Sequence, residues 1–184
     1  MNHKGTIQLE TDRLILRRFQ LGDAEAMLHN CWSDFDVWKW TSYDEMTSLD
    51  DIVVKNGLFT PWWMGLYANS NRYNWAIILQ STNQPIGRVF VMNLNEDSSE
   101  LEITYEIGKN WWNQGLMTEA LKEIIRFLFT EVLVKRIIAY HAKENPASGK
   151  VMKNLGMKPF KIVPDGYTCN AGMFDSYYYE ILSE

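Results

Sequence analysis

The chain has 184 residues, of which 46% are apolar and 14% aromatic, and its formal net charge is −5. This length fits one domain with a sizeable core, so we expect residues 1–184 to form a single domain. No stretch approaches the roughly 18 consecutive apolar residues of a membrane span, and the start lacks a signal peptide's apolar segment, so we expect a cytoplasmic protein with no membrane partner.

The usual metal ligands are scattered along the chain. Cys31 and Cys169 show no CxxC spacing, and His3, His29 and His141 do not pair with another ligand at metal-site spacing. We therefore expect neither a disulfide framework nor a bound metal.

Positive charge is concentrated between Lys135 and Lys161, where seven Lys and Arg residues accompany Glu144 alone, a balance of +6. Because the net charge of the whole chain is −5, the rest of the chain has a net charge of −11. A basic segment of this kind indicates either an anionic ligand or a solvated helix face, and the acidic remainder favours a cationic ligand.

The first part of the chain predicts a strand and two helices. Residues Arg13–Arg17 have the pattern of a short strand, and Asp23 is expected to cap a helix that runs towards Trp32. The segment 33–73 is rich in tryptophan and weakly patterned, with a second helix expected from about Ser48 onward.

The middle of the chain predicts an antiparallel meander followed by a long helix. The strand patterns are Trp75–Leu79, Ile86–Leu94 and Leu101–Ile107, separated by turn-rich segments. From Met117 to Val132, apolar residues recur at the spacing of a helix buried along one stripe.

The last part predicts a strand at Arg136–Ala142, a short helix at Pro146–Leu155 that Gly156 ends, and two strands around a turn at Asp165–Gly166. A strand, helix, strand crossover after a meander implies one parallel pair in a mostly antiparallel sheet. The fold class is therefore α+β, with about seven strands in a twisted sheet flanked by about four helices.

The junction Ile107–Thr118 is a strand, a loop and a helix N-terminus. Free N–H groups and the helix dipole favour an anion there, and Gly115 lets a phosphate approach the backbone, although an ordinary tight turn explains the same glycine. Glycines are too sparse for the loops GxxxxGK[ST] or GxGxxG, which disfavours an NTPase or a dehydrogenase.

The segment Trp112–Ala120, WNQGLMTEA, resembles the pyrophosphate-binding motif WGKGYATEA of GNAT acetyltransferases, in particular of the ribosomal-protein N-acetyltransferase (RimJ/RimL-like) branch. Other segments resemble that branch in order and spacing over almost the whole chain: TDRLILR at 11–17 (TERLILR), SDFDV at 33–37 (SDPEV), EITY at 102–105 (EIGY), NPAS at 145–148 (NxxS) and VMKNLGM at 151–157 (VLEKLGF). Asn110 stands where Gln or Arg is usual, and Asn113 replaces the first glycine of the loop. Asn tolerates positive φ, so we expect the loop to form.

The resemblance implies a GNAT fold in which the parallel strands splay apart, and an acetyl-CoA-dependent N-acetyltransferase without a metal. It implies that backbone amides from Gln114 to Thr118 hold the pyrophosphate and that the next helix contacts the pantetheine arm. The residues it assigns to acetyl-CoA are Ile107, Gln114, Gly115, Leu116, Met117, Thr118, Asn145 and Ser148, to which Lys150 and Lys153 add either phosphate contacts or only a solvated surface.

Catalysis requires a base, because a protonated amine cannot attack a thioester. One face of the strand Glu100–Ile107 carries Glu100, Glu102, Thr104 and Glu106, so it either is open to water or borders a polar cleft. The resemblance favours the cleft and makes Glu102 and Glu106 the candidate catalytic bases. Met152 stands where many GNAT enzymes have a tyrosine that protonates the departing thiolate.

The acceptor is expected beside the acidic segment 32–73, where Trp38 and Trp40 offer π-faces to an ammonium group or pack the second helix. A protein N-terminal amine fits the resemblance, and a cationic small molecule such as a polyamine fits the acidity. A non-catalytic acyl-CoA sensor and an RNA- or ribosome-associated module are the alternatives. Nucleic acid is not expected as a partner at this net charge, and the apolar content allows a homodimer.

Overall fold

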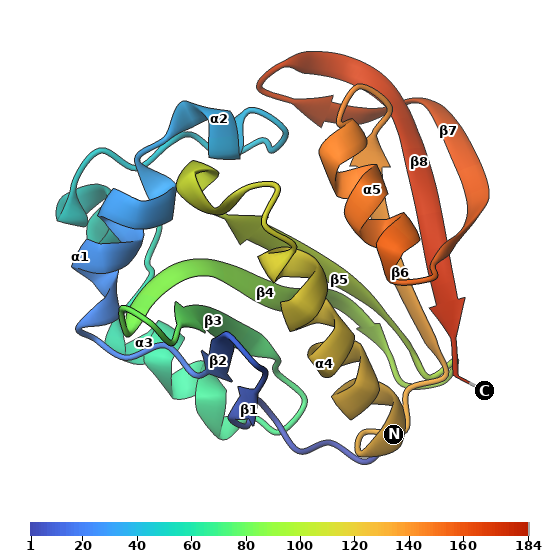
Figure 1. Ribbon diagram of the computed structural model, residues 1–184, viewed down its shortest axis with the longest axis horizontal. Coiled ribbons are helices and arrows are strands. Elements are labelled where there is room, and N and C mark those ends of the chain that lie inside the picture. Colours follow the sequence, from blue (N-terminus) through green and yellow to red (C-terminus); the bar gives the residue numbers. More distant parts are fainter. Residues whose placement is uncertain (184) are drawn as a thin grey trace.

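One mixed sheet forms the centre of the computed structural model, which describes residues 1–183 (Figure 1). Its strands lie in the order β1-β2-β3-β4-β5-β6-β8-β7. They are β1 Leu9–Glu10, β2 Leu14–Arg17, β3 Asn74–Leu79, β4 Gln84–Asn95, β5 Glu100–Ile107, β6 Arg136–Ala142, β7 Lys158–Cys169 and β8 Gly172–Leu182. The helices are α1 Asp23–Met27, α2 Phe35–Trp38, α3 Pro61–Gly65, α4 Leu116–Thr130 and α5 Pro146–Asn154. Short helical turns are η1 Leu28–Trp32, η2 Asp51–Lys55, η3 Leu66–Ala68 and η4 Lys109–Trp111.

The expected mixed sheet is confirmed. Strands β3, β4 and β5 form the antiparallel meander, and β5 pairs with β6 in parallel. Within residues 1–183 there are eight strands where about seven were expected, because β1 is too short to show an alternating pattern. The same residues form five α-helices where about four were expected, because α2 is a single turn of four residues.

Helices cover both faces of the sheet, as alternate residues of β3 show. Trp75 and Ile77 pack in a first core together with the apolar stripe of α4, which runs across β3, β4 and β5 in Figure 1. Ala76 and Ile78 pack on the other face in a second core with the helices that precede β3. Across the described residues, no helix combines the length and apolar character that a bilayer crossing requires.

The parallel pair splays as expected. In the described part of the chain, β5 and β6 pair over only three residues, from Glu100 with Arg136 to Glu102 with Ile138. Towards their carboxyl ends the two strands diverge (Figure 1). Helices α4 and α5 follow these parallel strands, so both begin at the end of the sheet where the gap opens.

The tip of the β7–β8 hairpin bridges the two halves of the sheet at the open end of this gap. The Asn170 backbone N–H donates to the Thr41 carbonyl at 2.8 Å, and the Asn170 side chain donates to the Tyr43 carbonyl at 2.7 Å. The Tyr167 hydroxyl donates to the Trp40 carbonyl at 2.6 Å. The segment after α2 is therefore tied to the hairpin, and Figure 1 shows the hairpin tip reaching towards α2.

Asp23 does not cap the first helix, which corrects the expectation. Gly22 is the N-cap residue, and the Asp23 carboxylate forms a two-point ion pair with Arg17, at 2.7 and 2.9 Å. The same carboxylate accepts the Gln20 backbone N–H at 2.8 Å. The helix expected from about Ser48 is present but short, since its helical turns end at residue 55.

The prediction of a turn at Asp165–Gly166 is also wrong. This dipeptide lies inside β7, where the register to β8 shifts between Val163 and Tyr167, and the reversal comes later, at residues 170–171. Asp165 has a φ of +49°. The left-handed tendency that suggested a turn here produces a β-bulge instead.

Candidate active site

The loop between β5 and α4 has the backbone shape of an anion site. Asn113 and Gly115 both have left-handed backbones, with φ of +60° and +77°, so the expectation that Asn113 tolerates positive φ is confirmed. Gly115 is the N-cap of α4 and offers no side-chain cap to the N–H groups that follow it. The Leu116 and Met117 side chains are buried, so these residues present only backbone to a ligand.

The space around Gly115 is open on the side where a side chain would lie. A Cβ added to Gly115 would meet only the Arg13 guanidinium, at 3.7 Å. Gln114 is exposed, and its side-chain amide donates to the Asn110 carbonyl at 2.8 Å, which closes the loop on itself. The Ile107 carbonyl at the end of β5 accepts the Trp112 indole N–H at 2.8 Å. An anionic group can therefore approach the N-terminus of α4 without displacing a side chain.

The N-terminus of α5 lies across the gap from β5. Asn145 is its N-cap, and its side chain accepts the Ser148 N–H at 3.3 Å. The Tyr105 hydroxyl donates to the Ser148 carbonyl at 3.2 Å and so links β5 to α5, and burial raises the pKa of this phenol. Lys150 and Lys153 are exposed further along α5.

The two candidate bases on β5 lie in different surroundings. The Glu106 side chain is 8% exposed, with Arg88 Nε 3.0 Å from its Oε1 and Arg88 Nη2 donating to its Oε2 at 3.2 Å. The Trp32 indole N–H also donates to Glu106 Oε1, at 2.8 Å. Glu102 is only half-buried and accepts one hydrogen bond, from Asn93 Nδ2 at 3.1 Å. Glu106 is thus held in a buried ion pair, whereas Glu102 has free lone pairs.

A cavity of about 820 Å³ opens on the sheet face that carries Glu102. Its polar lining includes Asn69, Asn71, Arg72, Asn93, Glu100 and Glu102. The first three of these residues come from the segment before β3, and the others come from β4 and β5. The expected polar cleft is therefore present beside Glu102.

Tyrosines flank Glu102, and the sequence reasoning missed them. Ile138 of β6 pairs with Glu102, so Tyr140, two residues on, lies on the same face. Tyr140 stacks on Tyr178 with ring centroids 4.7 Å apart and meets the edge of Tyr167 at 5.7 Å. Burial, and then the charge of Glu102, raise the pKa of the Tyr140 hydroxyl. The alternation of residues 136–142 is the sequence signal that could have placed Tyr140 on this face.

The two tryptophans expected to contact the acceptor, Trp38 and Trp40, pack against other residues of the protein. Trp38 is 1% exposed in the second core, and its indole N–H donates to the Trp32 carbonyl at 2.6 Å, so the expectation of an open π-face at Trp38 is wrong. Trp40 packs on Phe174 at 5.7 Å, and the Lys39 ammonium already lies 5.2 Å from its ring centroid.

Part of the acidic excess in residues 32–73 is neutralised. Asp36 pairs with Lys109, and Asp51 pairs with Lys55. The hydrogen bond from the lysine lowers the pKa of each carboxyl. Within residues 1–183, no three His, Cys, Asp or Glu side chains gather as a metal site requires.

Comparisons with known proteins agree with this arrangement. Residues 13–158 match the acetyltransferase (GNAT) domain family. The "Uncharacterized N-acetyltransferase YnaD" of Bacillus subtilis is 31% identical, with 97% of this chain and 98% of that protein covered. The "[Ribosomal protein uS5]-alanine N-acetyltransferase" of Escherichia coli is 27% identical, with 83% of this chain and 78% of that protein covered.

Solved structures share the fold. The ribosomal-protein-S5-alanine acetyltransferase from Vibrio fischeri superposes with a TM-score of 0.83 at 16% identity, covering 97% of both chains. Microcin C7 self immunity acetyltransferase MccE, solved in complex with acetyl-CoA and AMP, superposes with a TM-score of 0.79 at 18% identity, covering 94% of this chain and 93% of that chain.

Proposed function

The chain belongs to the GNAT acetyltransferase family and is an N-acetyltransferase, and on that premise we propose that it transfers the acetyl group of acetyl-CoA to the α-amine of a peptide or protein N-terminus. The observation that carries the proposal is the left-handed loop at Asn113 and Gly115, which opens the N-terminus of α4 beside the gap between β5 and β6. The MccE structure, which contains acetyl-CoA, supports the choice of donor.

The donor residues follow from the site. Backbone N–H groups from Gln114 to Thr118 bind the diphosphate, because α4 leaves them without intrahelical acceptors. Asn145 and Ser148 contact the pantetheine arm, and Ile107 borders it at the end of β5. Lys150 and Lys153 lie exposed on α5, where they neutralise the nucleotide phosphates. Acetyl-CoA supplies the acetyl group as a thioester.

Glu102 is the base in this proposal, and Glu106 is a structural residue. Glu102 takes a proton from the acceptor ammonium, directly or through a water, so that the neutral amine nitrogen attacks the thioester carbonyl carbon. A C–N bond forms, the C–S bond breaks, and the thiolate leaves with the electron pair of that bond. Met152 is buried in the first core and holds no proton for the thiolate, which then takes one from solvent.

The lining of the cavity favours a peptide over a polyamine. Side-chain amides such as those of Asn69, Asn71 and Asn93 both donate and accept hydrogen bonds, as a peptide backbone requires. The ammonium groups of a polyamine only donate hydrogen bonds. The second ammonium would also face the positive charge of Arg72, and the Glu100 carboxylate in the lining is already paired with Arg136. The relative from Escherichia coli, named for a ribosomal-protein alanine, supports the same class of acceptor.

The test is a thiol-release assay with acetyl-CoA and a panel of amines, with the products identified by mass spectrometry. The panel contains short peptides with a free N-terminus, the same peptides with a blocked N-terminus, spermidine and an aminoglycoside. We expect acetylation of the free peptides at the α-amine and no product from the blocked ones. Turnover of spermidine without turnover of any peptide would contradict the acceptor, and coenzyme A binding without turnover of any amine would contradict the transfer.

A further inference from the structure

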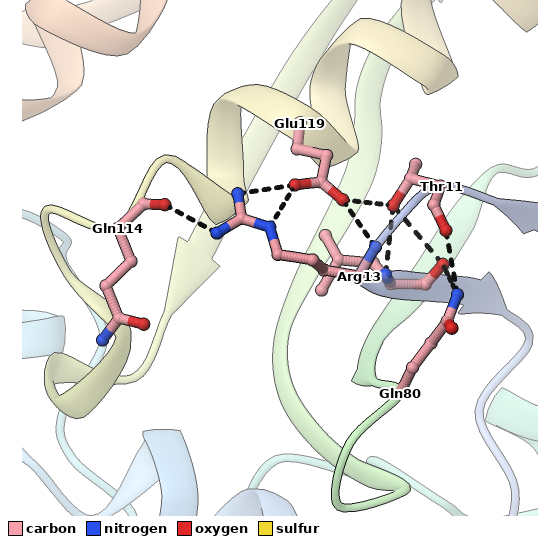
Figure 2. A network of polar contacts seen from close by, with 6 residues as sticks. Thr11, Arg13, Gln80, Gln114 and Glu119 are labelled. Atoms are coloured by element: carbon pink, nitrogen blue, oxygen red, sulfur yellow. Dashed lines mark hydrogen bonds and ion pairs between the residues drawn. The ribbon is translucent and has the colours of Figure 1, made fainter.

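A polar network outside the loop holds the Gln114 carbonyl of the loop through Arg13 (Figure 2). Arg13, the residue before β2, donates from Nη1 to the Gln114 carbonyl at 3.1 Å. The same guanidinium donates from Nε to Glu119 Oε2 at 2.7 Å, and its Nη2 lies 2.6 Å from that oxygen. Glu119 belongs to the first turns of α4, so Arg13 ties the helix to the loop that precedes it.

The far side of Glu119 is fixed as well. Its Oε1 accepts the Thr11 hydroxyl at 2.6 Å and the Arg13 backbone N–H at 3.0 Å. Gln80 Nε2 in turn donates to the Thr11 carbonyl at 2.9 Å. Burial by itself would raise the pKa of Glu119, but the hydrogen bonds from Thr11 and Arg13 outweigh it and lower this pKa, so the carboxylate stays charged. Contacts within the protein alone therefore hold the network in place.

The consequence for the loop follows from peptide geometry. The described chain has no cis peptide, and in a trans peptide the C=O of one residue and the N–H of the next point in opposite directions. When Arg13 holds the Gln114 carbonyl, the N–H of Gly115 must point away from Arg13. A peptide plane next to glycine turns easily, because glycine accepts both signs of φ. A turned plane would present the carbonyl oxygen to an anion and repel it.

We propose that Arg13 is a positioning residue of the donor site, which with Glu119 fixes the Gln114 carbonyl and thereby aims the Gly115 N–H at the diphosphate of acetyl-CoA. This inference rests on the proposed donor site at residues 114–118. Three of the five N–H donors of the Arg13 guanidinium face Glu119 and Gln114, and its charge is matched by Glu119. Because this charge is already paired, the proposal assigns Arg13 a role through the loop and not as a phosphate ligand.

The test compares coenzyme A with pantetheine, which lacks the diphosphate and the nucleotide. By calorimetry, Arg13→Gln should weaken coenzyme A binding roughly 10-fold, the low end for a hydrogen bond to a charged group. The affinity for pantetheine should stay within about twofold, since it makes no contact with the Gly115 N–H. A general loss of structure would weaken the binding of both coenzyme A and pantetheine, so an equal loss of affinity for the two would overturn the positioning role.

Glu119→Gln separates positioning from direct binding, because the two roles predict opposite signs. If Arg13 positions the loop, Glu119→Gln removes the anchor and coenzyme A binds more weakly. If Arg13 is a phosphate ligand, Glu119→Gln frees its charge and coenzyme A binds more tightly. Arg13→Lys adds a second check, since one ammonium cannot serve Glu119 and Gln114 together and should not restore affinity. Tighter binding by Glu119→Gln, or full affinity in Arg13→Lys, would overturn the inference.

Helix α4 supplies a matched control in the Arg126–Glu123 ion pair. Arg126 Nη2 lies 2.6 Å from Glu123, with side chains 53% and 22% exposed, against 48% and 19% for Arg13 and Glu119. The contacts of Arg126 lie further along the helix and include no loop residue. Arg126→Gln should leave both affinities unchanged. Wild-type protein that fails to bind coenzyme A would refute the proposed donor site itself, which is a different result from equal binding by wild type and Arg13→Gln.

Discussion

Gly115 carries the backbone conformation on which the donor loop depends. Its φ of +77° lies in the left-handed region, where an L side chain costs about 1–2 kcal/mol. Asn113, at +60°, has the same conformation with a side chain that tolerates it. The two residues differ in side chain, because a β-branched valine at Gly115 would drive φ out of this region and turn the N–H groups that the proposed diphosphate site needs.

We therefore predict that Gly115→Val abolishes coenzyme A binding in calorimetry while the protein stays folded. The fold should survive because an added Cβ meets no protein atom closer than 3.7 Å. Gly57→Val is the control, since Gly57 also has a positive φ, of +65°, and open space around it. This control should show similar strain in thermal denaturation with unchanged affinity. Normal coenzyme A affinity in Gly115→Val would contradict the site.

The two candidate bases on β5, Glu102 and Glu106, should respond in different ways to removal of charge. Glu102→Gln is expected to lower kcat/KM roughly 10²-fold, the low end for a general base, with the melting temperature unchanged. Glu106→Gln leaves Arg88 buried without its partner, so it should cost about 3 kcal/mol of folding free energy. Initial rates with the best acceptor and denaturant unfolding measure the two effects. A Glu102→Gln enzyme of wild-type rate would exclude Glu102 as the base.

At the level of elements, the sequence predicts best where periodicity is long. The stripe from Met117 to Val132 predicts α4, and the alternation in the meander predicts β3, β4 and β5, because both patterns record burial against the sheet. Short elements and tertiary contacts are not encoded in this way. The dipeptide Asp165–Gly166 fits a bulge as well as a turn, and no local pattern indicates that Trp38 is buried.

The site was predicted as unevenly as the fold. The loop at Gly115 was predictable because its chemistry lies in the backbone of one contiguous segment. The grip of Arg13 on Gln114 joins residues 101 positions apart, so no local pattern contains it. The assignments of Asn145, Ser148, Lys150 and Lys153 to the donor stay predictions.

Helix α5 packs on β6 through a buried histidine. His141 is 5% exposed, its Nδ1 lies 2.7 Å from the Ala142 carbonyl oxygen, and its ring stacks on Tyr179 at 5.6 Å. Gly149 of α5 lies so close that an added Cβ would be 2.7 Å from His141 Nε2. Burial lowers the pKa of His141, and the charge of Lys153 adds to this effect. The contact leaves no room for a solvated imidazolium.

This contact should make stability depend on pH. Because the folded-state pKa of His141 lies below the unfolded value of about 6.5, protonation favours the unfolded chain. The stabilisation is present in full above about pH 6.5 and is lost as the pH falls towards the folded-state pKa. We predict a lower urea midpoint at about pH 5 than at about pH 7, and a smaller difference in His141→Gln. The exposed His29 gives the control His29→Gln, and equal pH dependence in all three proteins would contradict the assignment.

At the scale of the whole molecule, the gap between β5 and β6 is bounded at one end by strand pairing and bridged at the other end by the hairpin. Three residue pairs join the strands at one end, and the contacts of the β7–β8 hairpin with residues 38–43 bridge the other. Both helix N-termini lie on one side of the gap, and the cavity beside Glu102 lies on the other face of the sheet. In the proposed function, donor and acceptor therefore enter from opposite faces and meet between the strands.

Weakening the contact of the hairpin with residues 38–43 should therefore change the KM for the acceptor and leave the affinity for coenzyme A unchanged. Asn170→Ala removes the side-chain hydrogen bonds to the carbonyls of Tyr43 and Trp38, each contributing about 1 kcal/mol. Hydrogen exchange of the Ala171 N–H, which donates to the Lys39 carbonyl at 3.1 Å, should accelerate roughly 10- to 30-fold. The KM for the acceptor should rise several-fold, whereas coenzyme A affinity should stay within about twofold because the hydrogen bonds of the hairpin tip go to residues 38–43 and not to the donor loop. Asn2→Ala, which removes one hydrogen bond to the Glu131 carbonyl at the far end of α4, should change neither constant. Faster exchange with an unchanged acceptor KM would show that the acceptor does not use this end of the gap.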